Sequence, residues 1–256
     1  MLKIINNVLI AFGINVYQLF TSLYDTPRFF VNYFRILKSK RGDNSFSLFP
    51  NYPVLGEIYK PGGTIKSHYF IQDLFVARKI YASSTKIHYD IGSRVDGFVA
   101  HLATFMEVTV LDIRNIPNTI DGIKFLKFDI TNPSNLELNS IESLSSLHVI
   151  EHIGLGRYGD QIDYYGHIVA LDNIYKIMKI GGVFYFSVPI GKQRIQYNAH
   201  RVFSVQYLCD LFKNKWSIVS FSFINDNGEL IENQDLNNFD SQYIKYGCGI
   251  FVLQKI

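Results

Sequence analysis

A chain of 256 residues suffices for one or two domains and for an apolar core without disulfide or metal cross-links. Its composition, 48% hydrophobic and 18% charged, excludes a disordered polymer, a coiled coil and a collagen-like repeat. Residues 1–80 carry ten basic and four acidic side chains, a net charge of +6, whereas residues 81–256 carry fifteen and eighteen, a net charge of −3. No block of like charges indicates a nucleic-acid partner. We interpret the basic residues as the solvated surface of helices, with contact to an anionic membrane surface or a diphosphate as the alternative.

Cysteine usage and the N-terminal residues bear on the compartment. Cys209 and Cys248 lie far apart and outside any ligand motif, which argues against a disulfide framework and a CxxC metal site. The first twenty residues are apolar, but Lys3 and several polar residues interrupt them, so they do not predict a membrane-spanning helix. They also lack an A-x-A cleavage site. We therefore expect a cytoplasmic protein, with peripheral membrane contact through the basic arm as the open alternative.

The first 80 residues predict a helical arm and a connector. Apolar residues recur at helical spacing through residues 16–37, which predicts two or three short helices over residues 1–38. Pro27 fits the first turn of one of them, with Thr26 as its N-cap. Residues 39–66 are rich in glycine and proline and predict a long irregular connector, and helical spacing returns over residues 67–81. We place the boundary between this arm and the following domain at residue 80.

From Lys86 onward, apolar strand-like runs alternate with amphipathic segments, which predicts a mostly parallel, Rossmann-like α/β sheet with helices on both faces. The last two strands have no helix between them, so we expect an antiparallel pair at one edge. Gly181 and Gly182 are expected to cap the C-terminus of a long helix, and Ser204 the N-terminus of another. The expected strands are 87–92, 107–113, 123–130, 140–150, 181–190, 216–226 and 246–256, and the expected helices are 95–105, 163–180 and 204–214.

The turn after the first strand has the sequence DIGSRVDG, and it predicts a nucleotide site. Gly92 allows a sharp turn and close approach of a ligand to the backbone, and the N-terminus of the following helix favours an anionic or polar group. The dinucleotide fingerprint G-x-G-x-x-G is not met, because Arg94 stands where its second glycine belongs. The remaining pattern, Asp90 and Gly92 followed by Gly97, suits adenosylmethionine better than the pyrophosphate of NAD.

Two further acids strengthen this interpretation. Asp112 ends the second strand, twenty residues after Gly92, where a carboxylate can accept both hydroxyls of a ribose. Asp129 ends the third strand, where it can reach an adenine amino group. Because the carboxyl ends of parallel strands meet at one edge of a sheet, we expect all three acids in one crevice.

The sequence HVIEH at residues 148–152 matches H-x-x-E-H, the zinc signature of inverzincin peptidases. That signature requires a helix that presents both histidines on one face. Here a strand precedes the motif and three glycines follow within IGLGRYG, so a helix is not expected. We predict a turn that faces a cofactor and an acceptor, and no metal site.

The segments DIGSRVDGF, VLDIR, FDIT, SSLHVIEHIGLGRYGD, GGVFYFSVPIG and NAHRVFS together resemble class I methyltransferases that use S-adenosyl-L-methionine (SAM). More narrowly, they resemble a bacterial methyltransferase-like family of unknown function whose members often belong to surface-polysaccharide gene clusters. The resemblance covers roughly residues 56–203 and is weaker before them. It implies a seven-stranded SAM-binding methyltransferase domain over residues 81–256, with the arm and connector covering the active site. The chain departs from the family pattern after Asp160, at Gln161, Tyr164 and Tyr165, which bears on the acceptor contacts more than on the cofactor site.

The resemblance and the residues together give a set of candidate site residues. HVIE replaces the N/D-P-P-Y of amide and adenine methyltransferases, which favours a hydroxyl acceptor with a histidine or carboxylate base. His200 is the first candidate for the base, His152 is its rival, and Glu151 follows them. The predicted acceptor contacts are Arg157, Tyr158, Asp160, Arg201 and His68. The predicted cofactor contacts are Asp90, Gly92, Ser93, Gly97, Asp112, Ile113, Asp129, Ile130 and His148.

Three hypotheses follow for the function. The first is a SAM-dependent O-methyltransferase, with S-adenosyl-L-homocysteine (SAH) as product, that acts on a nucleotide-activated sugar or glycan precursor of capsule or lipopolysaccharide. The second is an NAD(P)-dependent oxidoreductase or epimerase of nucleotide sugars, which would use the Tyr-x-x-x-Lys pair of Tyr175 and Lys179. The third is a non-catalytic binding module that keeps the fold. The sequence leaves the acceptor and the oligomeric state open.

Overall fold

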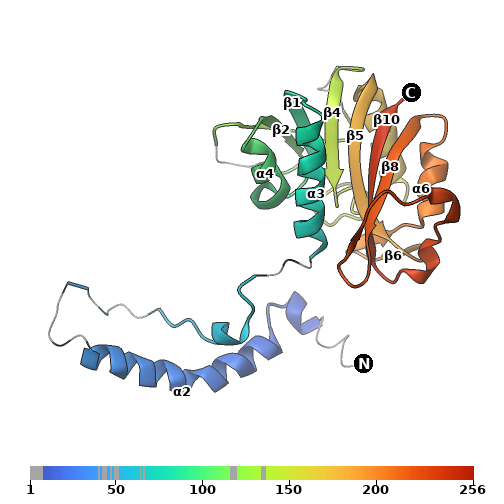
Figure 1. Cartoon of the computed structure of the whole chain (residues 1–256). Helices are drawn as coiled ribbons and strands as arrows, with labels where there is room; N and C mark the ends of the chain where they lie inside the picture. Colours follow the sequence, from blue (N-terminus) through green and yellow to red (C-terminus); the bar gives the residue numbers. More distant parts are fainter. Residues whose placement is uncertain are drawn as a thin grey trace. The chain divides into compact units, whose positions relative to one another are not determined.

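The computed structural model describes residues 8–39, 41, 45–46, 48, 52–63, 65, 67–115, 120–133 and 137–256. The chain separates into two compact units, Met1–Thr64 and Ile65–Ile256, shown in Figure 1. The division therefore falls between Thr64 and Ile65 rather than at residue 80, and the helix α3 (His68–Ala82) belongs with the sheet. That the arm covers the active site stays a prediction.

In the described part of the chain, the first unit contains helical residues at 8–11, the long helix α2 (Val16–Ser39) and a short 3-10 helix, η1 (Glu57–Tyr59). The expected break at Pro27 is wrong, because the helix continues through it. Thr26 is not an N-cap either, since its hydroxyl donates to the Ser22 carbonyl one turn earlier, at 2.8 Å. A proline removes one N–H from the helical ladder, and here that loss does not end the helix. Residues 1–7, where the first short helix was expected to begin, lie outside the described part of the chain.

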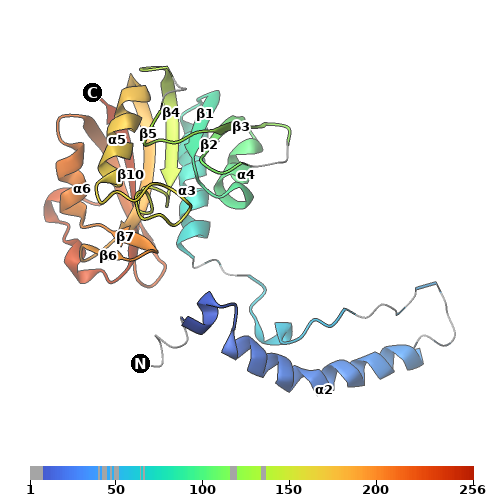
Figure 2. The same cartoon turned by 180° about the vertical axis from the view of Figure 1, so that it is seen from behind.

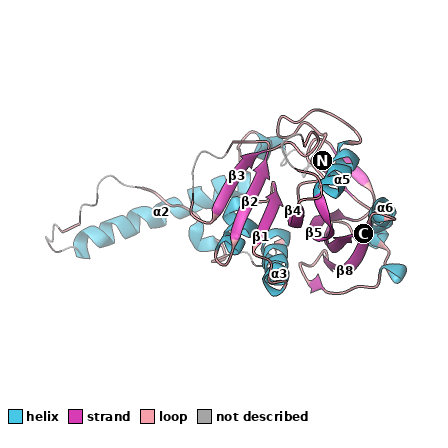
Figure 3. Cartoon of the chain, turned by 90° about the horizontal axis from the view of Figure 1, so that it is seen from above, coloured by secondary structure: helices cyan, strands magenta, loops and turns pink. Residues whose placement is uncertain are grey.

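The second unit is built on a mostly parallel sheet, as expected. In the described part of the chain it has eight strands in the order β3-β2-β1-β4-β5-β10-β8-β9, one more than predicted. Strands β1 to β5, which are labelled in Figure 3, run parallel. Strand β10 is antiparallel to both β5 and β8. The two-residue strand β9 adds the antiparallel edge. The strands are β1 (Ile87–Ile91), β2 (Glu107–Asp112), β3 (Ile123–Lys127), β4 (Ile141–Leu147), β5 (Met178–Ile190), β8 (Trp216–Ile224), β9 (Leu230–Ile231) and β10 (Gly247–Lys255).

Helices cover both faces of this sheet, and each face has its own apolar core. On one face lie α3, the π-helical turn η2 (Val95–Val99) and α4 (Ala100–Ala103), which bury Val76, Phe98 and Leu102 against the strands (Figure 1). On the other lie α5 (Gly166–Ile177) and α6 (Val205–Phe212), which pack on the aromatic side chains of β5 and β10 (Figure 2). The expected cap of α6 is confirmed, since Ser204 Oγ accepts a hydrogen bond from Tyr207 N. The 3-10 helices η3 (Leu236–Asn238) and η4 (Ser241–Tyr243) precede β10.

Two local predictions fail around β5. Helix α5 ends at Ile177 and β5 begins at the next residue, so Gly181 and Gly182 lie within a strand and cap no helix. The pairing register between β4 and β5 shifts between Ile141 and Ser143, and the two glycines lie in the part of β5 opposite this shift. A two-stranded ribbon, β6 (Arg194–Gln196) and β7 (His200–Val202), was also missed, because three-residue strands leave almost no periodicity to read.

A buried polar chain connects β1 to β4 beneath the edge of the sheet where the strands end. The fully buried ring of His88 bonds Ser143 Oγ through Nδ1 and Ser145 Oγ through Nε2, both at 2.8 Å. Ser145 Oγ donates onward to the Asp90 carboxylate, so His88 Nε2 carries the proton and Nδ1 accepts one. Burial lowers the pKa of His88 to about 3, which keeps the ring neutral.

His88 should make the fold sensitive to acid. The unfolded chain protonates this histidine near its ordinary pKa of 6.5, whereas the folded chain resists protonation down to about 3, so stability is lost as the pH falls below 6.5. In urea titrations, the stability advantage of wild type over His88→Gln should shrink by about 2 kcal/mol between pH 7 and pH 5. A difference that does not change with pH would contradict a neutral, buried His88.

Candidate functional site

A pocket of about 650 Å³ opens at the carboxyl ends of the parallel strands, where open α/β sheets bind their ligands. The ends of β1, β2, β3 and β4 and the loop after β4 all contribute to it. It is lined by Ile91, Gly92, Leu111, Asp112, Ile113, Arg114, Phe128, Asp129, Ile130, Thr131, His148, Val149, His152, Ile153, Tyr158 and Asp160. The lining includes six of the nine predicted cofactor contacts.

The turn after β1 is held by the buried carboxylate of Asp90. Its two oxygens accept hydrogen bonds from Ser93 N at 2.9 Å and Ser93 Oγ at 2.7 Å. Burial raises the pKa of Asp90 to about 6, against the opposing effect of these bonds. Gly92 has a φ of +64°, and a Cβ there would lie 3.1 Å from Val149 Cγ1, so glycine alone leaves the turn open. Asp90 and Ser93 thus shape the pocket from behind and do not line it.

A packing contact accounts for the glycine at position 97, and no ligand is needed to explain it. A Cβ at this position would lie 2.8 Å from Asp73 Oδ2, on the neighbouring helix α3. Asp73 is buried, accepts a hydrogen bond from Gln72 Nε2, and has its pKa raised by burial to about 6. The predicted cofactor contact of Gly97 is therefore corrected, because Asp73 occupies the space in front of it.

Asp112 lies in the pocket, as predicted, but it already has a partner. Arg114 Nη2 is 2.7 Å from Asp112 Oδ2, and Arg114 Nε and N are 3.0 and 2.8 Å from Oδ1. The Arg114 guanidinium also lies over the Tyr158 ring, 4.8 Å from its centroid. The motif gave no reason to single out Arg114, although it follows Asp112 by two residues. A ribose can reach this carboxylate once Arg114 releases at least one oxygen.

Asp129 and Ile130 line the adjacent part of the pocket. Asp129 Oδ1 accepts from Thr131 N at 2.8 Å and from Thr131 Oγ1 at 2.7 Å, and the carboxylate is exposed. Ile113 and Ile130 supply apolar surface on both sides of Asp112, together with Leu111 and Phe128. This mixture of apolar walls and a few carboxylates suits a nucleoside.

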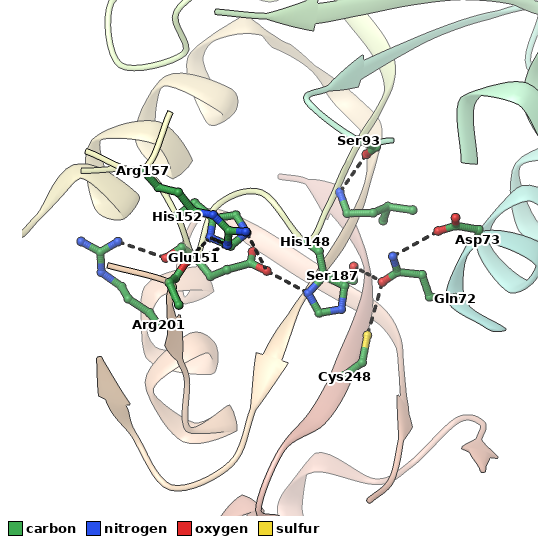
Figure 4. A network of polar contacts seen from close by, with 12 residues as sticks. Gln72, Asp73, Ser93, His148, Glu151, His152, Arg157, Ser187, Arg201 and Cys248 are labelled. Carbon is green, nitrogen blue, oxygen red and sulfur yellow. Dashed lines mark hydrogen bonds and ion pairs between the residues drawn. The ribbon is translucent and has the colours of Figure 1, made fainter. Parts of the chain in front are cut away.

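The residues after β4 form turns, so the peptidase interpretation of HVIEH is wrong. His148 has a φ of +56°, a left-handed backbone conformation at the point where the strand ends. Its Nδ1 is 2.8 Å from Glu151 Oε1, and both side chains are buried (Figure 4). Burial alone would lower the pKa of His148, but Cys248 and the Glu151 carboxylate face it and raise the pKa above its ordinary value. Among the described residues, Glu151 Oε2 and His148 Nε2 have no hydrogen-bond partner.

His152 lines the pocket in the tautomer that a general base requires. Its Nδ1 donates to the Ala199 carbonyl at 2.6 Å, which leaves the Nε2 lone pair unprotonated in the neutral ring. Nε2 is 3.8 Å from Glu151 Oε1, too far for a hydrogen bond. Arg157 Nη1 donates to the same carbonyl, at 3.0 Å, and therefore lies close to Nδ1. Burial lowers the pKa of His152, so the ring is neutral at pH 7.

His200 lies behind His152, outside the pocket lining, with ring centroids 6.3 Å apart. Burial lowers its pKa as well. The ring of Tyr246, which sequence reasoning did not single out, lies between His200 and His68, with centroid distances of 5.2 and 5.6 Å. His68 also stacks on His148, and its burial lowers its pKa to about 4. Tyr246 comes from the start of β10, too far along the chain for any motif to indicate it.

Two predicted acceptor contacts, Arg201 and Asp160, hold the loop after β4, and Asp160 also lines the pocket. The buried Arg201 guanidinium donates to the carbonyls of Ile153 at 2.6 Å and Tyr164 at 3.0 Å, and it holds the loop after β4 against β7. Asp160 accepts from Gly154 N at 2.7 Å and Tyr158 N at 3.2 Å, which closes that loop on itself. Arg201 is therefore not available to an anionic acceptor. Arg157 and Tyr158 are exposed, and Tyr158 lines the pocket.

The two residues that the oxidoreductase hypothesis requires lie outside the pocket lining. Tyr175 donates to the Ile256 carbonyl, and Lys179 pairs with Glu142 at 2.6 Å, so neither lines the pocket. Over the described ranges, no group of three or more metal-binding side chains is arranged to hold an ion.

A family model described as "Caenorhabditis protein of unknown function, DUF268" matches residues 99–256. The resemblance had implied a bacterial family, and neither this description nor the similar structures support an association with surface polysaccharides. No curated protein matches the sequence.

Solved structures of similar fold include methyltransferases and a cyclase. A 1,6-didemethyltoxoflavin-N1-methyltransferase from Burkholderia thailandensis, solved with SAH, is 12% identical, with 72% of this chain and 78% of that chain covered and a TM-score of 0.50. The [4+2]-cyclase SpnF is 10% identical, with 72% and 79% covered and a TM-score of 0.51. The N-methyltransferase NodS from Bradyrhizobium japonicum, also with SAH, is 15% identical, with 74% and 88% covered and a TM-score of 0.49. The fold is therefore the Rossmann-like fold of class I methyltransferases, and a cyclase shares it.

Arg201 gives a test that separates a structural role from an acceptor contact. Arg201→Met should lower the free energy of unfolding by about 3 kcal/mol, because it removes charged hydrogen bonds to buried carbonyls. Arg157→Met, at an exposed arginine, should cost less than about 1 kcal/mol. Urea denaturation measures both variants. An Arg201→Met protein of wild-type stability would return this residue to the acceptor site.

Proposed function

The chain belongs to the DUF268 family, to which its description assigns no function, and from that premise we propose that it is a SAM-dependent O-methyltransferase acting on a small acceptor. The observation that carries the proposal is the pocket in which Gly92, Asp112 and Asp129, from three successive strand ends, meet the oriented base His152. SAH bound to similar folds supports the cofactor.

The residues on the nucleoside side of the pocket fit this cofactor. The turn at Gly92 lacks a Cβ and leaves room for a ligand against the backbone. Asp112 would accept the ribose hydroxyls after Arg114 moves aside, and Ile113 and Ile130 would enclose the adenine. Asp129 would accept from the adenine amino group. His148, at the end of β4, would lie toward the methionine end.

The acceptor side requires a base and a means of orientation. When bound, SAM supplies an electrophilic methyl group on a sulfonium sulfur. His152 Nε2 would take the proton of the acceptor hydroxyl, which makes its oxygen a nucleophile for that methyl group. The Ala199 carbonyl holds the ring in the required tautomer, and the lowered pKa keeps it unprotonated at pH 7. His200, the first candidate by sequence, supports this ring from behind.

A sugar, nucleotide-activated or part of a glycan precursor, is the acceptor class that we propose to test first. Arg157 and Tyr158 are exposed beside His152, where a guanidinium can bind a phosphate and an aromatic ring can pack on a sugar face. NADH in place of SAM is disfavoured, because Arg94 interrupts the fingerprint and Tyr175 and Lys179 lie outside the pocket.

Asp112 should determine cofactor affinity. Asp112→Ala should weaken SAH binding on the order of tenfold to several hundredfold, since two charge-assisted hydrogen bonds are lost. Arg114→Ala is the matched control: it frees the same carboxylate, so affinity should stay equal or rise by up to about fivefold. Calorimetry measures both affinities. Equal SAH binding by wild type and a folded Asp112→Ala protein would refute the assignment, as would stabilisation by NADH and not by SAH.

His152 should determine turnover. His152→Gln should lower methyl transfer from labelled SAM to nucleotide sugars by about 10²- to 10⁴-fold, with SAH affinity retained. His200→Gln should lose much less, because His200 lies outside the pocket lining. Wild-type activity should rise as the pH passes upward through the lowered pKa of His152. Retained activity in His152→Gln together with loss in His200→Gln would pass the role of base to His200.

A further inference from the structure

Helix α2 carries a continuous apolar face that is exposed. At 100° per residue, its members fall within an arc of about 120° along the whole helix. The arc is wider than the narrow seam of a coiled coil and typical of a helix that buries one side. This apolar face of α2 consists of Leu19, Phe20, Leu23, Phe30, Val31, Phe34 and Leu37, with side chains 42–66% exposed.

The connector covers part of the opposite face of α2, around Asp25 and Thr21. Asp25 is buried and accepts a hydrogen bond from Gly56 N at 2.9 Å. Thr21 packs on the same glycine, where a Cβ would lie 3.0 Å from the Thr21 hydroxyl oxygen. Arg28 pairs with Asp25, at 2.9 Å between Nη2 and Oδ2. The connector therefore satisfies the polar side of the helix and leaves the apolar side outward.

The basic side chains of α2 favour an anionic partner. Asp25 is the one acidic residue of α2, and it is paired with Arg28. Arg35 and Lys38 follow in the last turns without an acid among them, and Arg41 comes next. Cations beside an apolar face rich in phenylalanine and leucine are typical of helices that lie in the interface of a membrane with anionic lipids.

A second copy of the chain suits this face less well. Phe20, Leu23, Phe30 and Phe34 recur with the spacing of a coiled-coil seam, but Pro27 stands in the middle of that seam. No described helix, α2 included, is long and apolar enough to cross a bilayer.

We infer that α2 binds an anionic membrane surface, with its apolar face at the boundary between headgroups and acyl chains and with Arg35 and Lys38 on the lipid phosphates. This inference stands independently of the proposed methyltransferase activity, since it uses residues of the first unit alone.

The test measures partitioning of the full chain onto vesicles by co-sedimentation. One set of vesicles is pure phosphatidylcholine, and the other contains roughly one third phosphatidylglycerol. Leu23→Ser/Phe34→Ser removes apolar side chains at exposed positions and should lower partitioning about 100-fold. Asn32→Ser, on the polar side of the same helix, is the matched control and should stay within about twofold of wild type.

The cations are tested separately. Arg35→Gln/Lys38→Gln should lower partitioning onto the anionic vesicles about 25-fold and leave partitioning onto phosphatidylcholine unchanged. Circular dichroism of each variant checks that the helix persists. Equal binding of wild type to both vesicle types, or wild-type binding by the apolar double variant, would overturn the inference. A concentration-dependent dimer that Leu23→Ser/Phe34→Ser abolishes, without vesicle binding by wild type, would assign the face to a second copy.

Discussion

The buried carboxylate of Asp90 joins three parts of the chain at the point where the pocket begins. It accepts the main-chain N–H and hydroxyl of Ser93 and the hydroxyl of Ser145, so the turn after β1 cannot open without leaving a buried charge unpaired. Ser93 Oγ in turn accepts from Leu147 N at 3.2 Å, at the end of β4. The same bonds that close the turn therefore fix the distance between the Gly92 backbone and the residues that follow β4, and His88 supports the chain from within the sheet.

The loop after β4 depends on a second buried group, the Arg201 guanidinium. Its hydrogen bonds to loop carbonyls hold the turn in which His148, Glu151 and His152 follow one another (Figure 4). Arg201 N also donates to the Glu151 carbonyl, at 3.0 Å. Residues far apart in sequence thereby support the orientation of His152, since Ala199 and Arg201 flank His200 in the ribbon after β5. Arginine suits this role because its planar fork serves several acceptors at once.

The sequence was sufficient for the mostly parallel sheet and for the strand ends that line the pocket, because each expected strand is an apolar run and Gly92, Asp112 and Asp129 end the first three or follow them. It could not predict Arg114 as the partner of Asp112 or Tyr246 as the neighbour of His68 and His200, since those contacts depend on side-chain directions and on segments distant along the chain. Pro27 and the Gly181–Gly182 pair were misread for a related reason: tertiary context kept a helix and a strand continuous through residues that usually end them. The same context turned Arg201 from an expected anion contact into a loop anchor.

We propose that the crevice at the ends of β1, β2 and β3 binds SAM, and a crystal structure with SAH would show whether it does. We expect the ribose hydroxyls to bind the Asp112 carboxylate, with the Arg114 guanidinium displaced from at least one of its oxygens. The adenine should lie between Ile113 and Ile130, and the sulfur should face His148. The hydrogen bond between His152 Nδ1 and the Ala199 carbonyl should be unchanged. An intact Arg114–Asp112 pair in a crystal soaked with SAH, with the ligand bound elsewhere or not at all, would contradict a SAM site at these strand ends.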